Sequence, residues 1–263
     1  MTINKLPQGA YISGQGTPVV LLHSSLSSAR QWQPLVKLLE PNFLVINIDI
    51  LGYGNADKVT ESENYNFDVE ISRIENIIAA VASNQPFHLV GHSCGGAIAL
   101  KLAVQQPDNI LSLSLYEPVA FHLLELGSEA RMLADDFADK VAIDDMYQAA
   151  EVFTNFWNKE GFFRSLPRKM QELMARDMPK VSLDFKGLTT EKYTLKDIGL
   201  IKCRTLMMTG DYSPELSKFL AGKVESAFVN ISHKNFPAGH MGPVSHSDII
   251  HPVIAKFIQG KGT

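Results

Sequence analysis

Cysteine and long apolar runs are scarce in this 263-residue sequence. Two cysteines, Cys94 and Cys203, are too few for a disulfide framework in a chain of this length, which favours a reducing compartment. No apolar run reaches the length that spans a bilayer, and residues 1–5 lack the charged-then-apolar pattern of a signal peptide. These absences predict a soluble, cytoplasmic protein with no membrane association.

Positive charge is also in short supply. The chain has 24 Lys and Arg against 28 Asp and Glu, a formal net charge of −4, so electrostatics gives no reason to expect a nucleic-acid partner. The histidines follow no metal-ligand spacing, and no metal or cofactor is expected. The expected partner is a small-molecule substrate, and nothing in the sequence bears on the oligomeric state. A hydrophobic content of 45% is typical of a globular protein whose core needs no disulfides.

Strand-like and helical patterns alternate along most of the chain, which indicates an α/β protein with a mostly parallel sheet. The expected strands are 10–13, 19–23, 43–49, 87–91, 110–116, 203–209 and 227–231. The expected helices are 28–39, 67–82, 94–105, 214–223 and 249–259. Between residues 118 and 200 the pattern is helical throughout. We therefore expect a core domain, 1–117 and 201–263, and a helical cap, 118–200, over the carboxyl edge of the sheet, where open α/β sheets bind ligands.

The strongest motif is Gly91-His92-Ser93-Cys94-Gly95, between a predicted strand and a predicted helix. A strand-to-helix turn of this kind forces unusual backbone angles on its central residue and needs small neighbours, hence the glycines. It lifts the Ser93 hydroxyl out as a nucleophile. The amide of Cys94, at the start of the helix, is placed to hold an oxyanion.

His240 lies in the segment Pro237–Pro243, after the last predicted strand and before the last helix. Imidazole titrates near neutral pH, so this side chain can take the Ser93 proton and return it to the leaving group. We predict that His240 is the general base.

These motifs occur together with Leu21-Leu22-His23-Ser24-Ser25…Trp32 and Asp49…Gly52-Tyr53-Gly54. The chain resembles the α/β-hydrolase family along nearly its whole length. The resemblance implies an eight-stranded, mostly parallel sheet, with the cap inserted after the strand that follows the nucleophile elbow. By position, Ser25 would supply the second oxyanion amide beside Cys94. The family usually has glycine where this chain has Ser24, and either serine hydroxyl could add a hydrogen bond.

The acid of the triad has two candidates. The family most often places it three residues after a glycine at the end of the strand preceding the base, where this chain has Ser213. Asp211 lies two positions earlier. Some members, haloalkane dehalogenases among them, carry the acid on the strand after the elbow, and there this chain has Glu117. We favour Glu117 over Asp211 as the carboxylate that orients His240.

Large apolar side chains are concentrated in segment 118–200, which predicts an apolar pocket over Ser93. The predicted function is a serine esterase that cleaves a small or medium, largely apolar carboxylic ester through an acyl-enzyme. A carboxylate-bearing substrate is also compatible with the sequence, because the same segment has four cationic side chains: Arg131, Arg164, Arg168 and Lys169. The alternatives are a carbon–carbon bond hydrolase, a lactonase or a perhydrolase-type haloperoxidase with the same triad, and, from another class, a small-molecule receptor with slow or no turnover.

Overall fold

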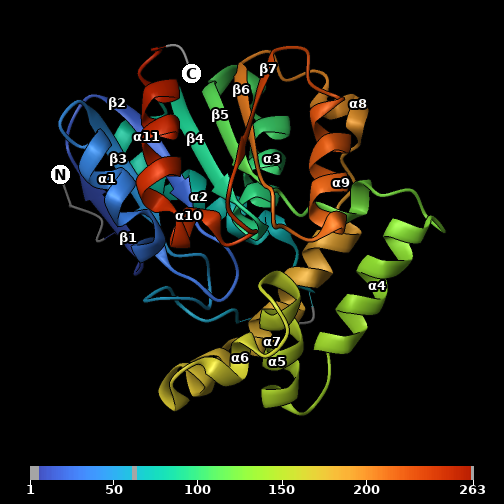
Figure 1. Cartoon of the computed structure of the whole chain (residues 1–263). Helices are drawn as coiled ribbons and strands as arrows, with labels where there is room; N and C mark the ends of the chain where they lie inside the picture. The colour runs from blue at the N-terminus through green and yellow to red at the C-terminus, as the bar shows by residue number, and fades with distance from the viewer. Residues whose placement is uncertain (1–5, 61–63, 262–263) are drawn as a thin grey trace.

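The computed structural model describes residues 6–60 and 64–261 as a twisted sheet between two layers of helices (Figure 1). In the described residues the sheet has seven strands in the order β1-β3-β2-β4-β5-β6-β7. Their bounds are β1 Ala10–Ser13, β2 Thr17–Leu22, β3 Phe43–Ile48, β4 Phe87–His92, β5 Ile110–Tyr116, β6 Arg204–Gly210 and β7 Ile231–Phe236. Only β1 runs antiparallel to its neighbour, β3; the other described pairs are parallel. The mostly parallel sheet is therefore confirmed, with one strand fewer in the described residues than the eight expected.

Alternate residues of each central strand face opposite sides of the sheet, and both sides are buried. In β2, Val19 and Leu21 join a core with α1 (Gln33–Leu39) and α11 (Ser247–Ile258). Val20 and Leu22 join the larger core on the other side, with α2 (Phe67–Ala82) and α3 (Cys94–Gln105). Burial on both faces explains why these strands read as continuous apolar runs.

The remaining described helices include the group between β5 and β6. In the inserted stretch they are η4 Phe121–Leu123, α4 Glu129–Val141, α5 Met146–Trp157, α6 Phe162–Ser165, α7 Arg168–Thr190 and α8 Leu195–Ile198. Elsewhere they are η1 Ala29–Trp32, η3 Pro107–Asn109, α9 Glu215–Glu225 and α10 Gly242–Ser245. Figure 1 shows α4 to α7 gathered beyond one end of the sheet. That end carries the nucleophile turn, since residues of α5 and α7 contact His240 and Ser25.

One predicted strand is misplaced. The pattern predicted a strand at 227–231, but β7 runs from Ile231 to Phe236. This strand lies at the edge of the sheet, its middle residues Ser232 to Asn235 are exposed, and its sequence is mostly polar, so it lacks the apolar signal of a buried strand. Residues 1–5, on which the signal-peptide prediction depends, lie outside the described residues.

Candidate active site

The turn at Ser93 has the strained geometry that its sequence predicts. Ser93 adopts φ 55° and ψ −119°, in a region that L-residues rarely occupy. Gly95 allows the close approach, because a Cβ there would lie 2.3 Å from the carbonyl oxygen of His23 and 2.6 Å from that of Leu22. A Cβ at Gly91 would lie 2.5 Å from the Gly95 carbonyl oxygen. Gly95 thus lets the turn pack directly on the end of β2, and Gly91 lets the start of α3 lie close to β4.

Cys94 is the first residue of α3, so its backbone N–H has no acceptor within the helix. Its side chain is fully buried, and burial raises the pKa of the thiol well above its usual value. The thiol therefore stays protonated at neutral pH and is a poor nucleophile. The Cys94 amide, not its sulfur, is the group suited to the site.

A continuous chain of hydrogen bonds joins Ser93, His240 and Glu117. The Ser93 hydroxyl lies 2.9 Å from Nε2 of His240, and Nδ1 of His240 lies 2.7 Å from Oε2 of Glu117. A carboxylate only accepts, so Nδ1 carries the proton and Nε2 accepts from the serine. All three side chains are buried, with exposed fractions of 6%, 1% and 0%.

Two side chains of the sheet hold the backbone of the His240 loop. The Nε2 of His92 donates to the His240 carbonyl oxygen at 2.8 Å, and the Tyr116 hydroxyl donates to the Gly239 carbonyl oxygen at 2.8 Å. Burial lowers the pKa of His92 well below its ordinary value, so its ring is neutral at neutral pH. The sequence placed His92 only in the turn. Its hydrogen bond to the His240 loop joins residues 148 positions apart, which no local pattern reports.

Glu117 has an environment that favours its ionised form. Burial raises the pKa of this carboxyl group, but the hydrogen bonds from His240 and the Gly210 amide, together with the nearby Ser213 hydroxyl, outweigh burial and lower it overall. The Gly210 N–H donates to Oε1 at 2.8 Å, and the Ser217 hydroxyl donates to Oε2 at 3.0 Å. Glu117 itself has φ 42°, which turns its side chain off the end of β5.

Asp211, the other candidate acid, lies in a different environment. It is exposed, and its carboxylate accepts a hydrogen bond from the side chain of Asn235 on the edge strand β7. Ser213, which occupies the family's usual acid position, is instead buried near Glu117. Of the two carboxylates, the structure brings Glu117 to His240.

The loop after β2 carries Ser24 and Ser25. His23 is buried, which lowers the pKa of its ring to about 4. Its Nδ1 lies 2.7 Å from the Ser24 carbonyl oxygen, and its Nε2 accepts from the Ile50 amide at 2.9 Å. The Ser24 hydroxyl donates to Gln31 at 3.1 Å, and the Ser25 hydroxyl donates to Asp184 at 2.6 Å. Both hydroxyls therefore donate their protons to other side chains, and neither is available to donate an extra hydrogen bond to an oxyanion.

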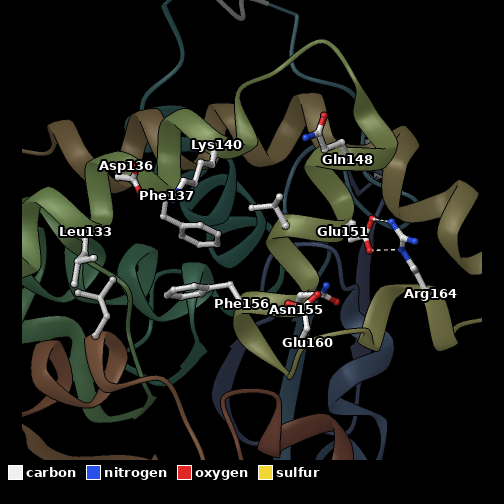
Figure 2. A pocket seen from close by; sticks show the side chains of 12 residues that line it. Leu133, Asp136, Phe137, Lys140, Gln148, Glu151, Asn155, Phe156, Glu160 and Arg164 are labelled. Carbon is white, nitrogen blue, oxygen red and sulfur yellow. Dashed lines mark hydrogen bonds and ion pairs between the residues drawn. The ribbon is translucent and has the colours of Figure 1, made fainter.

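Aromatic side chains of the inserted helices reach the base. The Trp157 indole stacks on the His240 ring, with centroids 4.0 Å apart and planes 25° apart. Trp157 also packs edge-on against Phe156 and Phe137, whose rings stack at 4.1 Å. Figure 2 shows these two phenylalanine rings together in a pocket of about 650 Å³, with the Glu151–Arg164 ion pair at its rim. Trp157 thus contacts both this aromatic wall and His240. Neither Ser93 nor His240 is among the residues that line the pocket, so the apolar pocket over Ser93 stays a prediction.

Lys180 and Asp184 were not singled out from the sequence. They lie one turn apart on α7 and form a buried ion pair. Their spacing predicts a shared helix face, but an i,i+4 ion pair is usually solvent-exposed, and no local pattern shows that this face is buried against Ser25.

Comparison with known proteins identifies the family. A sequence model of the alpha/beta hydrolase fold matches residues 17–214. The chain belongs to the alpha/beta hydrolase fold family, a family of hydrolases. Among the described residues, no helix has both the length and the apolar character needed to cross a bilayer.

Several distant relatives match over almost the whole chain. The pimeloyl-[acyl-carrier protein] methyl ester esterase of Legionella pneumophila (strain Corby) is 24% identical, over 94% of this chain and 97% of its own. A putative 2-succinyl-6-hydroxy-2,4-cyclohexadiene-1-carboxylate synthase of Bacillus subtilis is 24% identical, over 91% and 89%. The enol-lactonase structure from Burkholderia xenovorans LB400 superposes with a TM-score of 0.79 at 16% identity, over 96% of each chain. The structural likeness shows the fold.

Proposed function

We propose that this protein is a serine hydrolase that cleaves a small or medium, largely apolar carboxylic ester through an acyl-enzyme. The observation that carries the proposal is the buried chain of hydrogen bonds from Glu117 through His240 to Ser93. His240 takes the proton as Ser93 attacks the ester carbonyl, and the ionised Glu117 stabilises the imidazolium. The proton then goes to the leaving alcohol, and His240 activates the water that releases the acid.

The backbone amides of Cys94 and Ser25 are the proposed oxyanion donors. The Cys94 N–H has no acceptor within α3, and the turn packs against the loop that carries Ser25, since a Cβ at Gly95 would lie 2.3 Å from the carbonyl oxygen of His23. The two residues are therefore neighbours beside Ser93. Fixed donors in a site with little water stabilise the tetrahedral intermediate without having to reorganise.

The substrate class follows from the wall of the site. Trp157, which stacks on His240, and the phenylalanines behind it are apolar. Four charged side chains of the adjacent pocket neutralise one another in the ion pairs Arg164–Glu151 and Lys140–Asp136. An apolar acyl or alcohol group fits such a wall better than a charged one. The similarity to a methyl ester esterase supports an ester as substrate.

The test is a burst assay with p-nitrophenyl esters of two to eight acyl carbons, comparing the wild type with Ser93→Ala. We expect a burst close to one equivalent, followed by turnover, in the wild type and neither in the variant. The chain-length profile measures how much apolar substrate the site accepts. Turnover that persists in Ser93→Ala would contradict the mechanism.

A lactonase is the second candidate, favoured by the superposition on an enol-lactonase. A lactone is an internal ester, so the same groups perform the same steps and only the leaving alcohol stays attached. Ser93-dependent hydrolysis of γ- or δ-lactones with weak activity on open-chain esters would select this candidate.

A further inference from the structure

The buried carboxylate of Asp184 lies on α7, in the inserted helical segment, and reaches the loop after β2. Its Oδ2 accepts hydrogen bonds from the Ser25 hydroxyl and from the Tyr53 hydroxyl, each at 2.6 Å. Asp184 and Tyr53 are almost fully buried, with exposed fractions of 0% and 1%. Burial and the Asp184 charge raise the pKa of Tyr53 well above its usual value, so its hydroxyl remains a donor.

Lys180 neutralises this carboxylate. Its ammonium group pairs with Oδ1 of Asp184, donates to the Tyr65 hydroxyl at 3.0 Å and lies 3.6 Å from Oε1 of Glu70. Burial lowers the pKa of Lys180, but the charges of Asp184 and Glu70 outweigh burial and raise it overall. Lys180 therefore keeps its positive charge beside the Asp184 side chain.

The loop that Asp184 holds needs such support. Leu26, the residue after Ser25, has φ 52°, a left-handed conformation that leucine rarely adopts. On the other side, Ser24 is tied to Gln31 by its amide and its hydroxyl. The Ser25 side chain is tied to Asp184, 159 residues further along the chain.

We propose that Asp184 is a positioning residue for catalysis: by accepting a hydrogen bond from the Ser25 hydroxyl, it holds the Ser25 amide in place as an oxyanion donor. This inference rests on the proposed function. Its consequence is that the oxyanion site is complete only when α7 is seated on the sheet, so the inserted segment contributes to the chemistry and not only to substrate selection. A loop free to leave its position would weaken transition-state binding more than substrate binding.

The experiment compares wild type, Ser25→Ala, Asp184→Asn and the double variant, with p-nitrophenyl butyrate as substrate. Ser25→Ala keeps the backbone amide and removes only the hydrogen bond to Asp184. We expect each single variant to lower kcat by about 10- to 100-fold, less than the 10²- to 10³-fold typical of losing a donor outright. KM should change less than about threefold. The double variant should be no worse than either single variant, because both break one interaction.

A second readout separates positioning from general structural damage. The inhibitor 1,1,1-trifluoropentan-2-one forms a tetrahedral adduct with the serine and has the same acyl chain as butyrate. Its inhibition constant should rise by the same factor as kcat falls, whereas that of the product butyrate should not. Tyr65→Phe is the matched control, because the Tyr65 hydroxyl belongs to the same buried network but its hydrogen bonds are with Lys180 and Glu70. It should keep wild-type kcat.

The outcomes are distinct. Wild-type kcat in both single variants of an active enzyme would overturn this inference and leave the proposed function standing. A loss in Ser25→Ala without one in Asp184→Asn would also overturn it, since the hydroxyl would then act by itself. If Asp184→Asn does not fold because Lys180 loses its buried partner, the apolar double variant Lys180→Met/Asp184→Leu takes its place and is judged by the same two outcomes. A wild type without Ser93-dependent turnover would overturn both proposals.

Discussion

The two sides of Ser93 are held by different parts of the chain. On one side, His240 is fixed by Glu117, at the end of β5, and by other residues of the sheet. On the other side, Ser25 is tied to Asp184 on α7, outside the sheet. The base therefore depends on strand ends that the parallel sheet fixes, whereas the oxyanion loop also depends on how the inserted helices pack. Substitutions on the two sides should have different kinetic effects.

The largest expected effect is on the sheet side. Glu117→Gln should lower kcat by about 10⁴-fold, because a neutral amide neither selects the His240 tautomer nor stabilises the imidazolium. Steady-state kinetics with a p-nitrophenyl ester measures this. Asp211→Asn is the matched control and should keep wild-type kcat, since Asp211 is exposed and forms a hydrogen bond with Asn235. The reverse result, a large loss only in Asp211→Asn, would reject the assignment.

Gly95→Ala should damage the contact between the turn and β2. The added Cβ would lie 2.3 Å and 2.6 Å from the carbonyl oxygens of His23 and Leu22, and backbone atoms cannot rotate away. We expect a loss of about 1–3 kcal/mol in the free energy of unfolding, the usual range for overpacking, together with reduced kcat. Chemical denaturation measures the first effect. Gly222→Ala on α9 has open space around its Cβ and should be neutral or stabilising; equal stability of both variants would contradict the packing account.

Trp157→Phe should have a smaller effect. It weakens the stack on His240, and aromatic pairs contribute about 0.5–1.5 kcal/mol beyond burial, so kcat should fall by about 2- to 10-fold. Phe153→Leu removes a ring that contacts Trp157 but not His240, and it should change kcat less. An equal fall in kcat in Trp157→Phe and Phe153→Leu would show that the stacking of Trp157 on His240 does not contribute to kcat.

The smallest effect is the pH dependence of stability. The pKa of Glu117 is lower in the folded state than its ordinary value of 4.5, so its ionised form favours folding above that value. This contribution is lost as the pH falls through the folded pKa. The free energy of unfolding of the wild type, relative to that of Glu117→Gln, should therefore change little from pH 7 to 5. Below about pH 4.5 the wild type should lose stability relative to the variant. Thermal unfolding at each pH tests this, and a difference independent of pH down to pH 3 would rule it out.

The sequence predicted the parts of the molecule that depend on local pattern. Local sequence patterns, mostly apolar runs, located six of the seven described strands, and the glycines around Ser93 predicted the strained turn. The edge strand β7 was misplaced because its exposed, polar residues give no apolar signal. The bond between Ser25 and Asp184 was not foreseen, because it joins residues 159 positions apart and no periodicity reports on such a contact.

Chemical labelling of Ser93 tests the central claim most directly. The protein is treated with a fluorophosphonate, digested, and the modified peptide is identified by mass spectrometry in wild type and Ser93→Ala. We predict one adduct, on Ser93, that is absent from the variant and forms much more slowly in Glu117→Gln. An adduct on another residue, or a wild type that remains unmodified, would contradict the account.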